Sequence, residues 1–243
     1  MTHAPAPDHT IETTDLTVVI GGTGGIGAAL AQALEARGQR VLVLGRRTRP
    51  PVDYASEASV AHSAQHLADR LARHGEVLRS LIVATGVLHE GEVQPERSWS
   101  HLSAESLQRV FLVNTIGPAL VMRHFLPLLP RQGRCVAAFL SARVGSIGDN
   151  ALGGWYGYRA SKAALNQLVH TAAIELARRN REAFCVALHP GTVDTALSQP
   201  FAKTGLQVRP PAVAASELLQ VMDKLPAGST GGFFDHHGLG IPW

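Results

Sequence analysis

Residues 18–30 read VVIGGTGGIGAAL, an apolar run followed by a glycine-rich turn and then by a helical pattern. Glycines allow a tight turn and let the backbone approach a pyrophosphate, and a helix starting there offers unpaired N–H groups and a positive dipole end. A turn that binds nothing is the alternative. Because the turn follows the first strand of an alternating pattern, phosphate binding is favoured. The stretch therefore predicts a dinucleotide-binding unit at the start of an α/β fold.

Short apolar runs rich in β-branched residues alternate with helical patterns along the rest of the chain. Strands are predicted at 16–21, 40–44, 80–84, 134–140, 183–188 and 232–234, with a stub at 52–53, and helices at 25–37, 56–74, 103–129, 156–180 and 212–224. Such strands pair in parallel through right-handed crossovers, and strands apolar throughout are covered by helices on both faces. The sequence predicts a single doubly wound α/β (Rossmann) domain over 15–243, with a mostly parallel sheet of about seven strands, after a flexible tail at 1–14.

The composition favours a well-buried globular protein. Hydrophobic residues make up 45% of the 243 residues and charged residues 17%, which argues against disorder. The N-terminus lacks the features of a signal peptide, and no apolar run approaches the roughly 18 residues of a membrane helix, so we expect a cytoplasmic protein. The formal charge of +3 comes mainly from scattered Arg, so nucleic acid is not an expected partner. Twelve His lack metal-binding spacing, and no metal site is predicted.

A second informative stretch is GYRASKAAL at 157–165, which places Tyr158 four residues before Lys162. On an α-helix these positions share a face, so the phenol and the ammonium can point to one site. A phenol with a pKa of about 10 is a poor proton donor or acceptor near neutral pH, and a neighbouring cation lowers that pKa. An ordinary pair on a helix surface is the alternative. The spacing predicts an acid/base tyrosine made more acidic by a lysine.

The two motifs together resemble those of the short-chain dehydrogenase/reductase family. The spacing Gly21-xxx-Gly25-x-Gly27 is followed by Tyr158-xxx-Lys162 about 130 residues later, and the resemblance covers nearly the whole chain after the tail. Further matches, in the same order as in the family, are Asn114 within VNT and PGTVDT at 190–195. GSIGDN at 145–150 with GGWY at 153–156 is most similar to sniffer-type carbonyl reductases and bacterial C-factor-like proteins.

Three positions depart from the family pattern. The segment VATG at 83–86 keeps only Gly86 of the usual Asn-Asn-Ala-Gly, and Ile20 stands where a Thr normally precedes the first glycine. The family's catalytic Ser, three residues before a Gly, falls on Ala142, with Ser141 beside it. Either Ser141 takes the role or the donor is missing.

The resemblance implies roles for individual residues. Tyr158 would protonate a carbonyl oxygen as a nicotinamide delivers hydride to the carbon, and Lys162 would bind the nicotinamide ribose and lower the phenol pKa. Ser141 would stabilise the developing oxyanion. Asn114 would hold a relay water, with a helix-kink hydrogen bond as the alternative. The implied cofactor contacts are Gly21, Thr23, Gly24, Gly25, Ile26, Gly27, Arg46, Arg47, Asp53, Gly86, Tyr158, Lys162, Pro190, Gly191, Val193 and Thr195.

Cofactor choice depends on the end of the second predicted strand, which reads VLGRR at 43–47. An acidic residue there would accept from the ribose 2′-hydroxyl of NAD, whereas a guanidinium suits the 2′-phosphate of NADP. No acid is present and Arg46 and Arg47 follow, so NADP is favoured over NAD; two solvated loop arginines are the alternative. Asp53 matches a position that contacts adenine in the family, with a turn residue as its alternative.

These features predict an NAD(P)-dependent oxidoreductase, with NADP favoured, that acts on a carbonyl or secondary alcohol through Tyr158. The alternative is a nucleotide-binding regulatory or signalling protein with weak or no catalysis, because of the Ala142 register and the lost Asn-Asn pair. Apolar residues in the expected pocket loops, including Leu197, Phe201 and Leu206, suggest a hydrophobic substrate. By the same resemblance, the helices carrying Asn114 and Tyr158 would pair with a second subunit in a homodimer or homotetramer.

Overall fold

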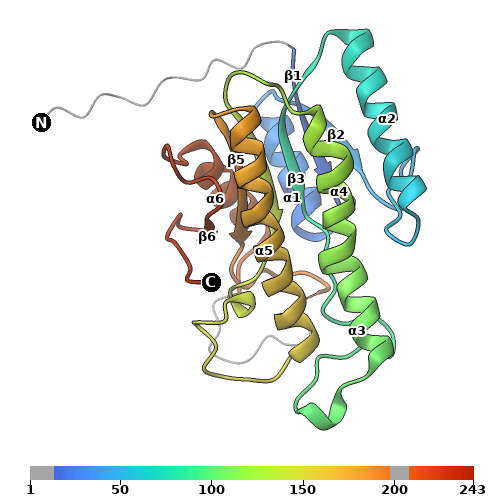
Figure 1. Cartoon of the computed structure of the whole chain (residues 1–243), viewed down its shortest axis with the longest axis vertical. Coiled ribbons are helices and arrows are strands. Elements are labelled where there is room, and N and C mark those ends of the chain that lie inside the picture. The colour runs from blue at the N-terminus through green and yellow to red at the C-terminus, as the bar shows by residue number, and fades with distance from the viewer. Residues whose placement is uncertain (1–13, 198–207) are drawn as a thin grey trace, which may run out of the picture.

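The computed structural model describes residues 14–197 and 208–243. The predicted tail at 1–14, apart from Thr14, and the pocket residues Phe201 and Leu206 lie outside the described residues. The described strands are β1 (Asp15–Ile20), β2 (Arg40–Leu44), β3 (Val77–Val83), β4 (Cys135–Leu140), β5 (Ala183–His189) and β6 (Phe233–Asp235). The helices are α1 (Gly25–Ala36), α2 (Glu57–His74), α3 (Ala104–Phe111), α4 (Gly117–Phe125), α5 (Tyr156–Arg179) and α6 (Pro211–Asp223) (Figure 1).

The six strands form one sheet in the order β2-β1-β3-β4-β5-β6, and every neighbouring pair is parallel. The chain runs from β1 outward to β2 and then returns to the other side of β1 as β3. Strand order therefore reverses between β1 and β3. In an open α/β sheet, ligands bind beyond the carboxyl ends of the strands at such a switch point. The topology confirms the predicted doubly wound fold.

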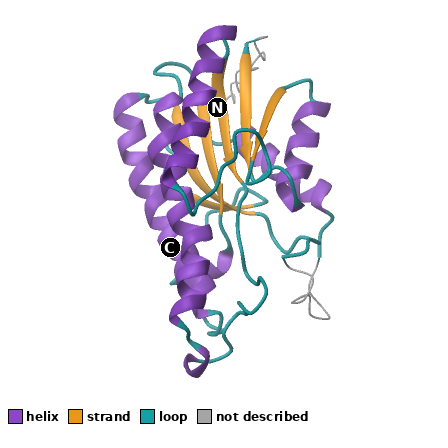
Figure 2. Cartoon of the chain, turned by 90° about the vertical axis from the view of Figure 1, so that its right-hand side faces the viewer, coloured by secondary structure: helices purple, strands orange, loops and turns teal. Residues whose placement is uncertain are grey.

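Helices cover both faces of the sheet, as Figure 2 shows from the side. On one face, Val18 of β1 belongs to a core cluster with Leu67 of α2, Phe125 of α4 and Leu165 of α5. On the other face, the next residue, Val19, packs in a cluster that includes residues of α1 and α6. Successive strand residues point to opposite faces. This double burial explains why the strands are apolar throughout.

Two expectations about secondary structure are corrected. The stub at 52–53 is not a strand: the buried Val52 donates its N–H to Gly45 O within the loop after β2, so six strands are described. The helix expected at 103–129 is divided into α3, a π-helical segment at Leu112–Ile116 and α4, followed by a 3-10 turn at Leu126–Leu128. A π-helical segment inside a helix is rare and is frequent at functional sites.

The helical stretch Ala104–Leu128 is also long and apolar enough to cross a membrane by length and composition, which the sequence expectation missed. In this fold, 44% of its most apolar window is buried. It packs against α2 and α5 as a core helix does, and core helices pass the same test of length and composition.

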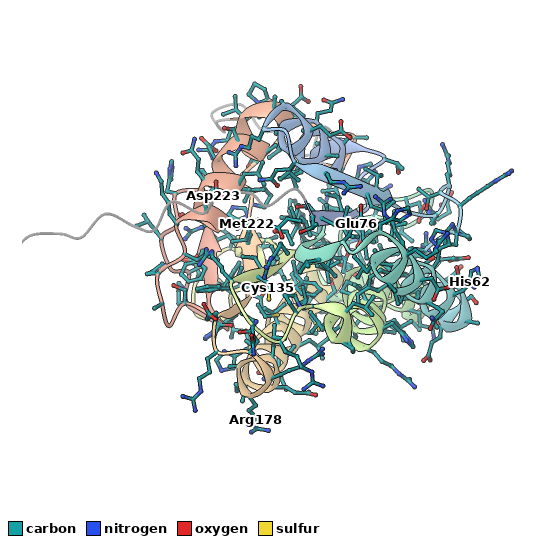
Figure 3. All side chains as sticks on the ribbon, turned by 90° about the horizontal axis from the view of Figure 1, so that it is seen from above. His62, Glu76, Cys135, Arg178, Met222 and Asp223 are labelled. Atoms are coloured by element: carbon teal, nitrogen blue, oxygen red, sulfur yellow. The ribbon has the colours of Figure 1, made fainter. Side chains whose placement is uncertain are left out.

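The amino ends of the strands, toward which Figure 3 looks, carry structural contacts. Glu76, at the start of β3, is buried and forms ion pairs with Arg70 at 2.7 Å and Arg40 at 2.7 Å. The hydrogen bond from Arg70 holds the pKa of the Glu76 carboxyl below its usual value. This ion-paired group anchors α2 and β2 to β3 at the edge opposite the predicted site.

Candidate active site

The glycine-rich turn connects β1 to α1 at the carboxyl edge of the sheet. Gly21 has φ +84° and Gly25 has φ +51°, in the left-handed region that favours glycine. A Cβ on Gly27 would collide with the Gly21 carbonyl oxygen, so only glycine fits there. The residues at the tip of the turn, 23–25, are exposed, and α1 begins without a side-chain cap. Its first N–H groups therefore suit a phosphate, as the sequence predicts.

The loop after β2 places Arg46 and Arg47 beside this turn. Both arginines are exposed, and an ideal Cβ on the preceding Gly45 would lie 3.5 Å from Thr23 Oγ1. Thr48 shapes the loop, since its Oγ1 lies 2.8 Å from each of the carbonyl oxygens of Gly45 and Pro50, which share its one proton. The two guanidinium groups are thus carried on an ordered loop near the predicted phosphate site.

Asp53 lies further along the same loop and is exposed. Its Oδ1 accepts a hydrogen bond from Ala55 N at 3.0 Å, the geometry of a turn residue. The next residue, Tyr54, points inward, where its hydroxyl lies 2.9 Å from Thr85 Oγ1 and its ring packs against Gly117. The turn role of Asp53 is therefore observed, and its predicted adenine contact stays a prediction.

Helix α5 places Tyr158 and Lys162 on one face, and both side chains are buried. Lys162 Nζ lies 5.9 Å from the centre of the Tyr158 ring and donates to Leu140 O, at the end of β4, at 2.9 Å. Tyr158 packs with Leu88 and Ala142 in a small apolar cluster, the tyrosine cluster, flanked by Val144, Trp155 and Leu197. Within the described residues the Tyr158 hydroxyl has no hydrogen bond. It is therefore available to a substrate.

Burial changes the pKa of both groups. It raises the pKa of Tyr158 to about 12, because the phenolate loses its hydration. It lowers the pKa of Lys162 to about 8, because the ammonium loses its hydration too. The expectation that Lys162 lowers the phenol pKa is therefore not met: burial raises it, and the Lys162 ammonium is directed at Leu140 O.

We expect this shift of Lys162 to appear in the stability of the protein. The unfolded chain keeps the lysine proton up to its ordinary pKa of 10.5, whereas the folded chain loses it near pH 8. Above about pH 8 the unfolded state keeps more protons on this lysine, so Lys162 should add a rise of about 2 kcal/mol to the free energy of unfolding between about pH 8 and pH 10. The buried thiols of Cys135 and Cys185, whose pKa values burial raises to about 11 and about 12, act in the opposite direction over the same range. The Lys162 contribution is therefore measured as the difference in slope between variants. Lys162→Met should remove this rise, as urea denaturation at a series of pH values would measure. Lys224→Met, at an exposed lysine, should keep it; equal slopes in wild type and Lys162→Met would contradict the expectation.

The two candidates for the oxyanion donor point to different places. Ser141 is buried and donates from Oγ to Asn166 Oδ1 of α5 at 2.6 Å. Ala142 is the residue that contacts the tyrosine cluster. Neighbouring residues of an extended segment point to opposite sides, so the one-residue difference decides which side chain faces Tyr158. The structure brings the Ala142 methyl group to Tyr158, and a role for Ser141 at the substrate stays a prediction.

Asn114 lies in the π-helical segment and is fully buried. Its Oδ1 accepts from Val87 N at 2.8 Å, while its Nδ2 donates to Val87 O at 2.9 Å and to Ser161 Oγ at 3.1 Å. An ideal Cβ on Gly86 would lie 3.6 Å from both Asn114 Oδ1 and Lys162 Nζ. The structure therefore brings Gly86, Asn114 and Lys162 together, with Asn114 joining the loop after β3 to α5. The relay water stays a prediction.

The segment after β5 lies across the glycine-rich turn. Gly191 has φ +77°, and Thr195 Cγ2 lies 3.5 Å from an ideal Cβ on Gly25. Leu197, two residues further, packs on the tyrosine cluster, and His89 Nε2 lies 2.9 Å from Ala196 O. Two stretches far apart in sequence, the turn after β1 and the segment 190–197, thus frame one site with Tyr158.

Sequence reasoning missed several residues of this site. Asn166 is four residues after Lys162, so its helical spacing could have revealed it. Leu88, in the tyrosine cluster, comes from the irregular loop after β3, where no periodicity marks which side chains turn inward. Ile20, a departure from the family pattern, is fully buried in the core below the turn.

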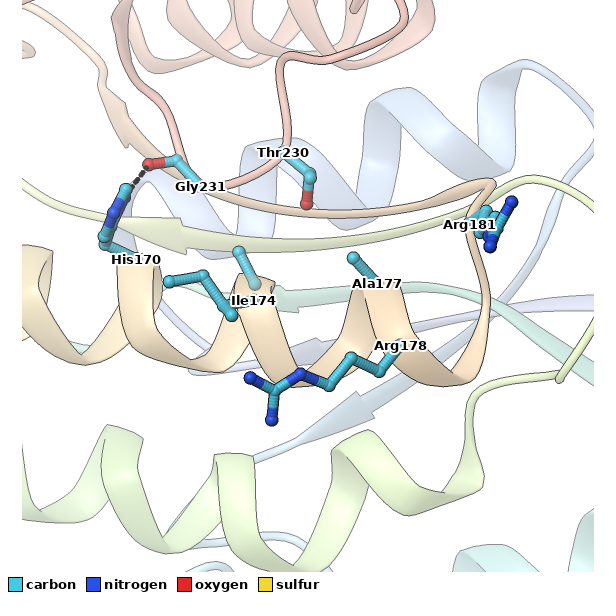
Figure 4. A pocket seen from close by; sticks show the side chains of 8 residues that line it. His170, Ile174, Ala177, Arg178, Arg181, Thr230 and Gly231 are labelled. Carbon is cyan, nitrogen blue, oxygen red and sulfur yellow. Dashed lines mark hydrogen bonds between the residues drawn. The ribbon is translucent and has the colours of Figure 1, made fainter.

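A separate hollow of about 450 Å³ lies between α5 and the loop before β6. Figure 4 shows Ile174 and Ala177 on the α5 side, with His170 hydrogen-bonded to Gly231 O at 2.9 Å. None of the predicted site residues lines this hollow. In the part of the chain that the structure describes, no group of three or more His, Cys, Asp or Glu residues is placed to hold a metal ion.

Known proteins resemble this chain in sequence. The family model described as short chain dehydrogenase matches residues 15–205. The 1-hydroxy-2-glutathionyl-2-methyl-3-butene dehydrogenase of Rhodococcus sp. (strain AD45) is 30% identical over 237 residues, which cover 93% of this chain and 98% of that protein. The C-signal protein of Myxococcus xanthus is 36% identical over 137 residues, covering 56% of this chain and 78% of that protein.

Solved structures share the fold at lower identity. The NADPH-bound carbonyl reductase from chicken fatty liver has a TM-score of 0.81 at 24% identity, covering 96% of this chain and 100% of that one. The carbonyl reductase Sniffer of D. melanogaster has a TM-score of 0.80 at 20% identity, with the same 96% and 100% coverage.

Proposed function

The chain belongs to the short-chain dehydrogenase/reductase family of NAD(P)-dependent oxidoreductases, and from this we propose that it reduces a hydrophobic carbonyl compound with NADPH. The observation that carries the proposal is the pair Tyr158 and Lys162, buried on one face of α5 with the Tyr158 hydroxyl unengaged among the described residues. The segment 190–197 and the glycine-rich turn frame this pair.

Tyr158 is the proton donor in this proposal. Its phenol is protonated at neutral pH, as a general acid for carbonyl reduction must be, but a pKa raised to about 12 by burial makes it a weak acid, so the proposal depends on a cation that favours the phenolate as the proton leaves. Lys162, beside Gly86, can orient a ribose hydroxyl and favour the phenolate once the proton has left. Asn114 holds the backbone at Val87 and so supports the geometry around Gly86.

The chain also offers the parts that a nicotinamide dinucleotide requires. The open N-terminus of α1 and the glycines at 21, 25 and 27 suit the pyrophosphate, and Arg46 and Arg47 suit a 2′-phosphate. When bound, the cofactor supplies the hydride. Pro190, Gly191, Val193 and Thr195 are proposed to border the nicotinamide end.

The substrate class follows from the side chains around Tyr158. Among the described residues, it is surrounded by apolar surface from Leu88, Ala142, Val144 and Leu197 and by the ring of Trp155. Such a lining favours a hydrophobic aldehyde or ketone over a charged or sugar-like substrate. The test is NADPH oxidation by the purified protein with aliphatic and aromatic aldehydes and diketones. Turnover with these and not with carboxylated analogues supports the proposal, whereas cofactor binding without turnover on any of them contradicts it.

The preference for NADPH can be tested on the loop after β2. Replacing both Arg46 and Arg47 by Ala should raise KM for NADPH about tenfold, because charge-assisted hydrogen bonds to the 2′-phosphate are lost. KM for NADH should stay within about twofold, since that cofactor has no such phosphate. Arg131→Ala, at another exposed arginine, serves as the control. If KM changes equally for NADPH and NADH, Arg46 and Arg47 do not recognise the 2′-phosphate. The two arginines would then be solvated loop residues.

The alternative of a nucleotide-binding regulator with weak or no catalysis rests on Ala142 and on the lost Asn-Asn pair at 83–86. The dehydrogenase relatives favour the enzyme.

We further propose a cytoplasmic homo-oligomer that pairs through α5 and through the helix that carries Asn114, which comprises the π-helical segment Leu112–Ile116 and α4. Exposed Ile116 and Ile174 on these helical segments support that face, and light scattering of the purified protein would test it.

A further inference from the structure

Helix α5 carries Tyr158 as its third residue. No side chain of the residues that begin this helix caps its first N–H groups. Its N-cap residue, Trp155, has a left-handed conformation (φ 53°, ψ 43°) and makes no side-chain capping bond. No acidic residue lies in the first turn. The first N–H groups of a helix need acceptors, and a negative charge is favourable at that end. The position of Tyr158 therefore depends on acceptors from elsewhere.

Glu96, in the loop between β3 and α3, supplies two of these hydrogen-bond acceptors. Its Oε2 accepts from Gly157 N at 3.1 Å, and its backbone oxygen accepts from Trp155 N at 2.6 Å. The two contacts lie on either side of Tyr156, at the start of the helix, and they join residues about 60 positions apart in sequence. Glu96 is 5% exposed, so water competes little for its carboxylate.

The lack of a side chain at Gly157 leaves room for this contact. An ideal Cβ there would lie 2.8 Å from Glu96 Oε1 and 3.2 Å from Leu107 Cδ2, so a side chain would displace the carboxylate. Among the described residues Glu96 has no ion-pair partner. Its buried charge faces the amino end of α5, whose partial positive charge compensates a carboxylate.

The turn before the helix is held from a second direction. Arg159 donates from Nε to Gly154 O at 2.9 Å and from Nη2 to Gly153 O at 3.1 Å. These bonds fix the glycines, whereas Glu96 fixes the backbone on both sides of Tyr156. Trp155, whose ring stands edge-on to that of Tyr158 at 6.3 Å between centres, moves with the same backbone.

We propose that Glu96 is a positioning residue for catalysis: it caps α5 from the loop after β3 and thereby sets the place of the Tyr158 hydroxyl. The inference rests on the proposed reductase function, since the consequence is read in turnover. A displacement of a reacting group by about 1 Å can cost about a hundredfold in rate. The glycine-rich turn belongs to other elements, and Lys162, further along α5, is held separately by its hydrogen bond to Leu140 O, so cofactor affinity should depend little on Glu96.

The experiment compares variants that keep or withdraw the acceptor. Glu96→Gln keeps an oxygen at the same reach, whereas Glu96→Asp shortens the side chain by one methylene. We expect Glu96→Asp to lower kcat at least about tenfold, with KM for NADPH within about twofold, and Glu96→Gln to keep kcat within about threefold. Gly157→Ala, which displaces the carboxylate from the other side, should match Glu96→Asp. Glu92, an exposed acid of the same loop, is the matched control, and its Gln and Asp variants should behave as wild type.

The inference is overturned if Glu96→Asp and Gly157→Ala both keep wild-type kcat. It is also overturned if their losses appear equally in kcat and in NADPH affinity, as general damage would give. Lack of turnover in the wild type would refute the proposed function instead. In that case amide hydrogen exchange at residues 155–159 still tests the cap, which requires faster exchange in Glu96→Asp than in wild type and in Glu96→Gln.

Discussion

Tyr158→Phe is expected to lower kcat about a thousandfold while leaving NADPH affinity within about twofold, because positioned proton transfer typically contributes 10²–10⁴-fold. The substitution removes one oxygen from a buried side chain whose hydroxyl has no partner among the described residues. The ring and its contacts with Leu88 and Ala142 remain. Loss of the fold is therefore not the expected cause of the loss of turnover.

The measurement is steady-state reduction of the best aldehyde substrate, with cofactor affinity from calorimetry and the thermal midpoint as a check on folding. Tyr156→Phe is the matched control, since Tyr156 is exposed, lies two residues earlier in the same helix and makes the same chemical change. It should keep kcat within about twofold. A Tyr158→Phe protein that retains more than about a tenth of wild-type turnover would show that another group supplies the proton.

Ala142→Ser is expected to raise kcat about tenfold to a hundredfold, an unusual direction for a substitution in a working site. A single oxyanion donor is worth about 10²–10³ in kcat when removed from an enzyme that has it. Here Ala142, rather than a serine, belongs to the tyrosine cluster. A serine adds one oxygen at a nearly buried position, 9% exposed, so part of the gain will be offset by its desolvation.

The companion variant Ser141→Ala separates the two candidates. With its hydroxyl bound to Asn166 Oδ1 at 2.6 Å, Ser141 should contribute little to turnover, and its Ala variant should keep kcat within about threefold. A hundredfold loss in Ser141→Ala together with no gain in Ala142→Ser would assign the donor to Ser141. In that event the serine must leave Asn166 when substrate binds.

Much of the fold could be predicted because local patterns carry it. Apolar runs such as 183–188 have no polar alternation, and only a strand covered on both faces explains that. The strand at 52–53 could not be excluded in the same way, since Val52 is as buried as a strand residue yet bonds to Gly45 within a loop. The π-helical segment around Asn114 likewise leaves no mark in the helical periodicity.

The properties of the site can likewise be separated into those that local sequence predicts and those that depend on other elements. Tyr158 and Lys162 are four residues apart, and helix geometry alone places them on one face. The pKa of each depends on burial by residues from other elements, which reversed the expected direction for the phenol. The order of Ser141 and Ala142 in the sequence names both candidates, but the direction in which the chain leaves β4 decides which side chain meets Tyr158.

The sequence by itself determined the alternation of strands and helices, the glycine-rich turn and the Tyr-Lys pair, because each depends on residues within one or two turns of chain. The tertiary structure decided the strand order, the partner of Ser141 and the contact of Glu96 with Gly157. These depend on which distant segments meet and on how much water they exclude. The spacing of residues along the sequence predicts neither.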